Sequence, residues 1–260
     1  MYKKIQIAFL ISFLCLSVNA ANETLQTYFN KSQINSIMEY KKSYEKIKSA
    51  KDLAITYNKA DKIRETLIKS LNSYKNTESD NFDLEKYKWL NPYIPGLKLT
   101  SAAEGMGINV IYDNPTLLKK AKTTPQKSDD LFINLMLDNY GDAGDNYPTW
   151  FMMTWDYGGY TLLGKGNHIK ALNKINITIK SSSEFIEGLK GLRERLFMDI
   201  RDSNNFAVPK TAVLKEINAI KQMSNLSVFE KNIINKRVKE LNKNSKIFQF
   251  NCEKAECSYG

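Results

Sequence analysis

LAITYNKADKIRETLIKSLNSY, residues 53–74, decides the fold class of this chain. Its apolar and aromatic side chains recur every three or four residues, which is the repeat of one face of an α-helix. The residues on this face are Leu53, Tyr57, Ala60, Leu67, Leu71 and Tyr74, interrupted by Arg64. Ser49 followed by Asp52 has the spacing of a capping box, which places the helix start just after Ser49. We therefore expect a long helix that packs one face on the rest of the protein.

A second helix precedes this one. Its apolar positions are Ile34, Ile37, Met38, Tyr44 and Ile47, and only a short break separates the two patterns. The sequence therefore predicts an αα-hairpin over residues 21–80. The polar stretch NTESDN (76–81) follows and is typical of a linker, so we predict a second segment, the main domain, over residues 81–260.

The middle of the chain, residues 96–180, differs in composition because it holds nine of the twelve glycines. Residues 106–112 alternate between apolar and polar, as in a half-buried strand, and strand-forming residues recur in TWFMMTW (149–155), YTLL (160–163) and INITIK (175–180). Asn114-Pro115 resembles an N-cap followed by proline at the first helical position, and Ser128-Asp129-Asp130 is expected to cap a second helix. We predict a small antiparallel sheet embedded among helices.

The C-terminal third is again helical in pattern. Apolar stripes predict three helices, over residues 185–200, 209–220 and 227–241, and KIFQF (246–250) predicts a last strand. Cys252 and Cys257 follow, and their spacing suits a disulfide that fixes the tail better than a metal or redox site. The fold class is therefore α+β and predominantly helical.

The first twenty residues, MYKKIQIAFLISFLCLSVNA, have the pattern of a secretory signal peptide. A basic start, an apolar run from Ile5 to Val18 and the sequence Val18-Asn19-Ala20 fit a cleavage site after residue 20. We expect an exported protein, periplasmic or extracellular, whose mature chain has no transmembrane segment. An oxidising compartment also agrees with two remaining cysteines that can pair.

The formal net charge of the chain is +10. Lysines spread over every segment produce it, whereas a nucleic-acid reader more often shows arginine-rich clusters. We therefore expect no nucleic-acid partner, and read the charge as solubility plus weak attraction to anionic surfaces. Sugar polymers or proteins of the cell envelope are the expected partners.

Several catalytic classes are excluded by what the sequence lacks. His168 is the one histidine, so two-histidine zinc motifs such as H-E-x-x-H are absent, and no G-x-S-x-G occurs. LGKGNH (163–168) is rich in glycine but matches no phosphate-binding motif, so a turn is expected there. A triad assembled in space around His168 stays open.

Carboxylates are the better candidates for catalysis. Glu104 lies among small and apolar residues, a setting that raises the pKa of a general acid. Asp142 or Asp145 is the candidate second carboxylate of a glycosidase-like pair. The same loop offers oxygen ligands for calcium from Asp138, Asp142 and Asp145, although it lacks the spacing of an EF-hand. Ordinary turn chemistry is the alternative for all of these residues.

The strongest local signal is a cluster of aromatic side chains around the acidic loop. The candidate binding residues are Tyr147, Trp150, Trp155, Tyr157 and His168. Strand geometry would put Trp150 and Trp155 on opposite faces, one in the core and one exposed for a sugar or peptide. The alternative is that all these rings fill the core.

Three functions remain open on the sequence alone. The favoured one is a binding protein that contacts a glycan, peptide or protein through the central aromatic and acidic segment. Inhibitors and immunity-type proteins belong to this class. The second is a polysaccharide or cell-wall hydrolase that uses Glu104 as general acid with a loop aspartate. The third is an envelope scaffold, which an exposed apolar stripe over residues 53–74 would favour.

Overall fold

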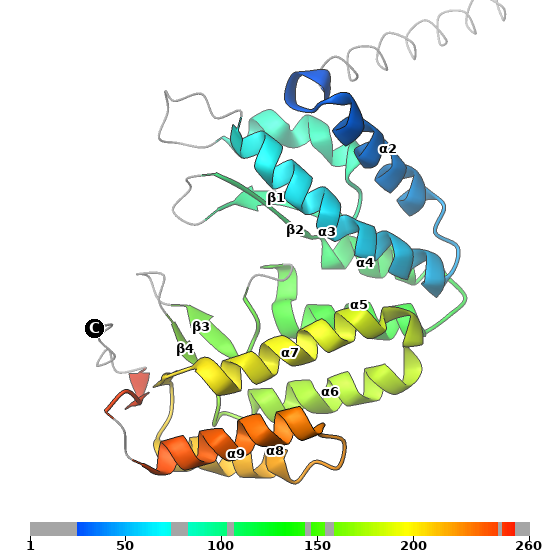
Figure 1. Ribbon diagram of the computed structural model, residues 1–260. Coiled ribbons are helices and arrows are strands. Elements are labelled where there is room, and N and C mark those ends of the chain that lie inside the picture. Colours follow the sequence, from blue (N-terminus) through cyan, green and yellow to red (C-terminus); the bar gives the residue numbers. More distant parts are fainter. Residues whose placement is uncertain are drawn as a thin grey trace, which may run out of the picture.

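The computed structural model describes residues 25–73, 83–102, 107–143, 147–153, 159–243 and 246–252. Most of these residues are helical, and the strands form one two-stranded and one four-stranded sheet. The predicted α+β, predominantly helical class is confirmed. Figure 1 shows two layers of elements, which we call the upper half (residues 25–121) and the lower half (residues 128–252).

The predicted pair of N-terminal helices forms the outer part of the upper half. Helix α2 (Lys31–Glu45) begins at a capping box between Asn30 and Gln33, and α3 (Ala50–Ser73) begins after Ser49, whose hydroxyl accepts a hydrogen bond from the Asp52 backbone. The stripe on α3 is buried, as amphipathicity requires. It therefore supplies no exposed arm of the kind that would favour a scaffold.

A β-hairpin packs against α3. Strands β1 (Leu97–Ser101) and β2 (Ile108–Tyr112) are antiparallel. The Asn72 side chain joins α3 to this hairpin, because its amide donates to the Ile108 carbonyl and accepts from the Ile108 backbone N–H, both at 2.8 Å. The strand expected over residues 106–112 is thus present as β2.

Two short helices flank the hairpin. One is a 3₁₀ helix, η1 (Leu84–Tyr93), which Asp83 caps. Helix α4 (Asn114–Ala121) starts one residue earlier than expected, since Asp113 and not Asn114 is its N-cap. Asp113 is the N-cap because its carboxylate accepts hydrogen bonds from both the backbone N–H and the hydroxyl of Thr116.

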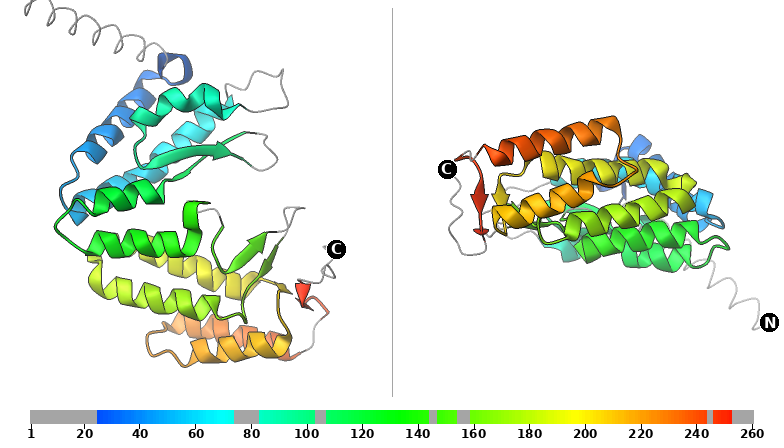
Figure 2. Two further views of the ribbon diagram at one scale, coloured as in Figure 1. Left: turned by 180° about the vertical axis from the view of Figure 1, so that it is seen from behind. Right: turned by 90° about the horizontal axis from the view of Figure 1, so that it is seen from below.

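Five helices build the lower half: α5 (Ser128–Tyr140), α6 (Asn167–Ser181), α7 (Ile186–Asp202), α8 (Lys210–Lys221) and α9 (Val228–Asn242). Two short 3₁₀ turns accompany them: η3 (Gly141–Ala143) follows α5, and η4 (Ser183–Phe185) lies between α6 and α7. The last three helices match the apolar stripes of the sequence. Figure 2 shows α8 and α9 side by side as the layer farthest from α2 and α3.

Two expectations about these helices are wrong. INITIK (175–180) is not a strand but part of α6, because Leu172, Ile175 and Thr178 continue a helical repeat and are buried, while Ile177 is exposed. The predicted cap of α5 is also absent: Lys127 is the N-cap and makes no side-chain capping bond. Asp129 is instead buried and accepts a hydrogen bond from the Thr124 hydroxyl at 2.7 Å.

The second sheet is only partly antiparallel, which corrects the expected topology. Its strands are β3 (Phe151–Met153), β4 (Gly159–Thr161), β5 (Asn205–Phe206) and β6 (Gln249–Phe250), in that spatial order. β3 and β4 are antiparallel, whereas β4–β5 and β5–β6 are parallel. The helix pairs α6–α7 and α8–α9 carry the chain back between the parallel strands, so each strand re-enters in the same direction.

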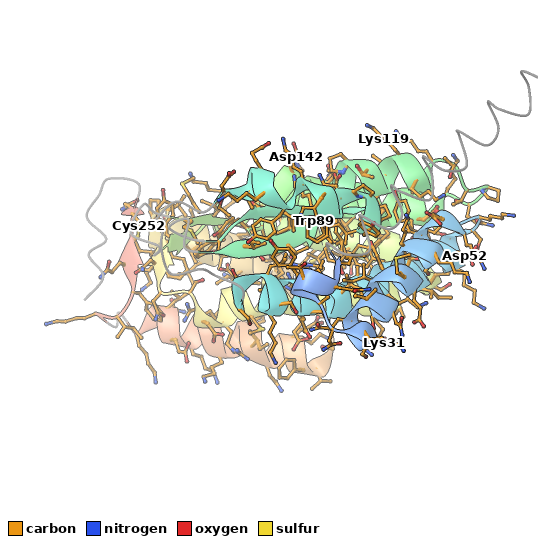
Figure 3. All side chains as sticks on the ribbon, turned by 90° about the horizontal axis from the view of Figure 1, so that it is seen from above. Lys31, Asp52, Trp89, Lys119, Asp142 and Cys252 are labelled. Atoms are coloured by element: carbon orange, nitrogen blue, oxygen red, sulfur yellow. The ribbon has the colours of Figure 1, made fainter. Side chains whose placement is uncertain are left out.

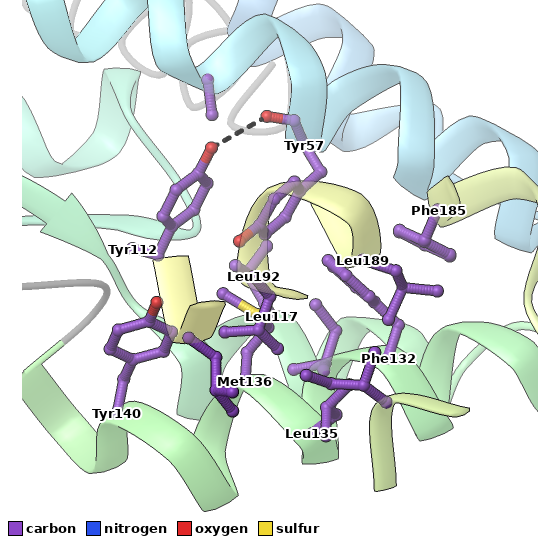
Figure 4. Packing of buried hydrophobic residues seen from close by; sticks show 14 of the residues in the cluster. Tyr57, Tyr112, Leu117, Phe132, Leu135, Met136, Tyr140, Phe185, Leu189 and Leu192 are labelled. Carbon is purple, nitrogen blue, oxygen red and sulfur yellow. Dashed lines mark hydrogen bonds between the residues drawn. The ribbon is translucent and has the colours of Figure 1, made fainter. Parts of the chain in front are cut away.

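One hydrophobic cluster runs through both halves. At their junction the Tyr57 ring meets Phe132 edge to face at 5.1 Å, and Phe132 stacks on Phe185 at 4.3 Å (Figure 4). The division of the chain at residue 80 stays a prediction. Among the described residues, none of the helices combines the length and apolar character that crossing a bilayer needs.

Candidate functional site

Five of the predicted site and disulfide residues lie outside the described residues: Glu104, Asp145, Trp155, Tyr157 and Cys257. The paired-carboxylate hypothesis and the opposite-face arrangement of the two tryptophans therefore stay predictions. Cys252 is 5 % exposed and lies beside β6, at the end of the molecule opposite Asp52 (Figure 3). Its pairing with Cys257 also stays a prediction.

Trp150 and His168 belong to the core. Trp150 is 1 % exposed and His168 is fully buried, with their ring centroids 6.2 Å apart. For Trp150 the structure agrees with the prediction that its ring lies in the core. The ring is therefore not available to a ligand at the surface. Among the members of the group that the structure describes, Tyr147 is exposed, at 44 %.

The histidine is held by a carboxylate and not by a hydroxyl. His168 Nε2 lies 2.7 Å from Asp199 Oδ2, and the same carboxylate accepts hydrogen bonds from the hydroxyls of Thr161 and Ser203. A catalytic triad needs its nucleophile bonded to the imidazole. Here both hydroxyls bond to the aspartate, so this cluster joins β4, α6 and α7 as a structural network.

Two carboxylates of the acidic loop, Asp138 and Asp142, are among the described residues. Asp138 pairs with Lys174 at 2.6 Å, and Asp142 is exposed in η3, where its side chain points away from the molecule (Figure 3). Over the described ranges there is no cluster of three or more His, Cys, Asp or Glu that could hold a metal ion. Because Asp145 is not among those residues, the calcium site stays a prediction.

The glycine-rich turn at residues 163–168 is built around a buried carboxylate. Glu216 on α8 accepts hydrogen bonds from the backbone N–H groups of Gly164, Gly166 and Ile169, at 2.5, 2.9 and 3.0 Å. Gly164 and Gly166 both have positive φ, which glycine alone adopts readily. The turn has the form of an anion-binding nest at a helix start, and the protein's own Glu216 occupies it.

A pocket of about 210 Å³ lies where the two halves meet. It combines apolar and aromatic surface with a few charged groups, which is the usual composition of a ligand site. Its lining residues come from α3, β2, α5 and α7: Tyr57, Asn58, Asp61, Tyr112, Met136, Tyr140, Glu187, Gly188, Gly191, Leu192 and Arg195. Figure 4 shows the three tyrosines and Met136 around this junction.

The tyrosines are fixed before any ligand arrives. Tyr57 and Tyr112 stack with centroids 4.2 Å apart and an angle of 6°. The Tyr112 hydroxyl donates to Asp61 at 2.8 Å and lies 3.3 Å from the Tyr57 carbonyl, while the Arg195 guanidinium donates to the Tyr140 hydroxyl at 3.3 Å. Such preorganisation lowers the entropy cost of binding.

Charged side chains lie next to Tyr112 at one wall of the pocket. Arg64 lies over the Tyr112 ring at 4.6 Å and pairs with Asp61 at 3.4 Å. Burial, followed by the neighbouring Tyr57 and Asp61, raises the pKa of Tyr112 far above its ordinary value. Tyr112 therefore keeps its proton and remains a hydrogen-bond donor to Asp61.

One helix of the pocket carries two glycines on its inner face. At Gly188 an added Cβ would meet the Phe132 ring at 3.0 Å, so close packing explains that glycine. At Gly191 an added Cβ would find no described atom within 4 Å apart from its chain neighbours and the backbone of its own helix. Gly191 therefore opens space beside the tyrosines without a packing requirement.

Comparisons with known proteins return no similarity: no family model matches the chain, and neither a curated protein nor a solved structure matches it. The pocket must therefore be interpreted from its own geometry. The sequence pattern missed it because its tyrosines come from a helix stripe and a strand that are remote along the chain. The available signal was Gly188 and Gly191, three residues apart within a predicted helix.

Proposed function

We propose that this protein is an exported binding protein whose pocket between α3 and α7 takes one ring or side chain of a glycan or peptide. The favoured role from the sequence is retained, but the site moves from the acidic loop to the junction of the two halves. Tyr112, Met136 and Tyr140 are the lining residues that come from the middle of the chain, residues 96–180.

Gly191 is the observation that carries the proposal. A glycine inside a helix costs about 1 kcal/mol of folding stability relative to alanine. The described residues leave room for a methyl group at this position, so packing does not require the glycine. The space is best explained by an occupant that needs it.

The size and chemistry of the pocket narrow the ligand. Drug-sized ligands occupy pockets of about 300–1,000 Å³, and this one is smaller, at about 210 Å³. It suits a single sugar ring or amino-acid side chain that belongs to a larger partner. Tyrosine rings supply an apolar face, and Asp61, Glu187 and Arg195 supply polar contacts at its rim.

The test compares two substitutions of Gly191 in the full chain, using a panel of envelope glycans and peptides measured by calorimetry. Gly191→Ala should raise the free energy of unfolding by up to about 1 kcal/mol, because it improves helix propensity. Gly191→Leu should fill the pocket and abolish binding while the protein remains folded.

The matched control is Ala219→Leu, which introduces the same side chain at an exposed position of α8. It should leave binding unchanged. Binding that persists in Gly191→Leu with unaltered affinity would remove this pocket from the functional account.

Export and the disulfide are part of the same proposal and have their own test. The mass of the protein isolated from cells should correspond to a chain that begins at Ala21, less two hydrogens for the Cys252–Cys257 bond. A retained N-terminus or a mass unchanged by reduction would contradict the respective part.

A further inference from the structure

Half of the net charge of the chain lies on one helix pair. Residues 210–243, which contain α8 and α9, carry eight Lys and Arg against three Glu, a net of +5 out of +10. Two of these glutamates, Glu216 and Glu230, are buried, and Glu240 lies within 4 Å of Lys236 and Arg237. The exposed charge of this layer is therefore almost entirely positive.

An apolar pair projects from the same layer. Val228 and Phe229 are 77 % and 64 % exposed at the first turn of α9. Phe229 also borders a groove of about 290 Å³ between α7 and α9, whose floor includes Phe197 and Ile233. The capping box of Ser227 and Glu230 fixes this turn, so the two side chains are held outward.

Together these features describe a membrane-contacting surface. Lys221 and Lys231 are exposed at the end of α8 and the start of α9, on either side of the apolar pair. Exposed aliphatic and aromatic side chains enter the boundary between lipid headgroups and acyl chains, and surrounding basic residues attract anionic headgroups.

We propose that the α8–α9 layer docks on an anionic phospholipid bilayer and inserts Val228 and Phe229. Charge complementarity selects this occupant, since the layer holds +5 and offers apolar side chains as well. A soluble polyanion would require the lysines but not the apolar pair. The surface is separate from the pocket between α3 and α7, so this inference stands without the proposed ligand.

The experiment is co-sedimentation of the chain isolated from cells with vesicles. One set contains phosphatidylcholine alone, and the other an equal mixture of phosphatidylcholine and phosphatidylglycerol. We expect binding to the anionic vesicles that weakens as salt is added. The double variant Val228→Ser/Phe229→Ser should bind about tenfold or more weakly, as loss of two inserted apolar side chains requires.

Two matched controls separate this surface from general properties of the chain. Met38→Ser/Ile55→Ser removes two exposed apolar side chains from α2 and α3. Lys59→Glu/Lys62→Glu changes the net charge by the same amount as Lys221→Glu/Lys231→Glu, but on α3. Both control variants should retain most of the binding, whereas the reversal of Lys221 and Lys231 should lose it.

Three results would overturn the proposal. One is absence of binding to the anionic vesicles. Another is equal weakening by the two charge reversals, which would indicate only the overall charge. The third is full binding by Val228→Ser/Phe229→Ser together with loss in Lys221→Glu/Lys231→Glu, which would assign the layer to polyanions in general.

Discussion

Glu216 shows how one residue determines the local chain path. Its carboxylate accepts three backbone N–H groups from the turn between β4 and α6, at 2.5–3.0 Å. It is 6 % exposed, so water cannot replace it for these donors. The glycine-rich turn therefore has a structural role, in which the Glu216 carboxylate satisfies its backbone N–H groups.

Replacing Glu216 should destabilise the fold through those donors. In Glu216→Gln the amide keeps one acceptor oxygen but places N–H groups against backbone N–H groups, so we expect a loss of about 1–3 kcal/mol. The free energy of unfolding from urea titration measures it. Glu45→Gln, at an exposed position on α2, is the control and should change stability little.

At the scale of elements, α9 is fastened to α7 by a buried ion pair. Arg193 donates from Nε and Nη2 to the two oxygens of Glu230, at 2.5 and 3.1 Å. Both side chains are about nine-tenths buried. Burial alone would raise the pKa of Glu230, but the hydrogen bonds from Arg193 and Ser227 outweigh burial and lower it.

This lowered pKa predicts an acid-sensitive contact. A carboxyl group whose pKa is lower in the folded state stabilises the fold above its unfolded pKa, near 4.5, and loses that contribution as pH falls through the folded pKa. Glu230→Gln should therefore cost about 1–3 kcal/mol at neutral pH and flatten the fall in stability below about pH 4.5. Thermal unfolding across acidic pH measures both; an unchanged acid slope would contradict the assignment.

The elements that the sequence predicts best are helices with a long apolar stripe. The sequence predicts α3, α7 and α8 because each buries one face, and the Ser49–Asp52 spacing marks the start of α3. INITIK misled because its β-branched residues at every second position resemble a strand, although Leu172 and Thr178 extend a helical repeat. Alternation over six residues cannot separate the two periods.

The candidate pocket could not be predicted in the same way. Tyr57 and Tyr112 are each explained locally, one by a helix stripe and the other by a strand. Their stacking depends on how β2 packs across α3, which no local pattern records. The parallel pairing of β4, β5 and β6 escaped prediction for the same reason, since each pair joins remote segments.

At the scale of the whole molecule, the two halves share one core. Phe132 links Tyr57 of the upper half to Phe185 of the lower half, and it is 1 % exposed. No hydrophobic boundary separates the halves within the described cluster. We therefore expect them to unfold in one cooperative transition.

Phe132→Ala tests this coupling. Loss of the buried ring should cost about 3–5 kcal/mol. Single-tryptophan versions that retain either Trp89 or Trp150 report separately on the two halves. Both reporters should show the same lowered midpoint, whereas an unfolding transition that shifts in one half only would show that the halves are independent.

Parallel pairing in the second sheet also governs when the protein can fold. Phe206 on β5 pairs with Thr161 on β4, 45 residues earlier, and with Phe250 on β6, 44 residues later. Contacts at such separations form slowly, because long loops must close first. The sheet is therefore completed only after residues 249–250 have left the ribosome, later than the helices that lie between its strands can form.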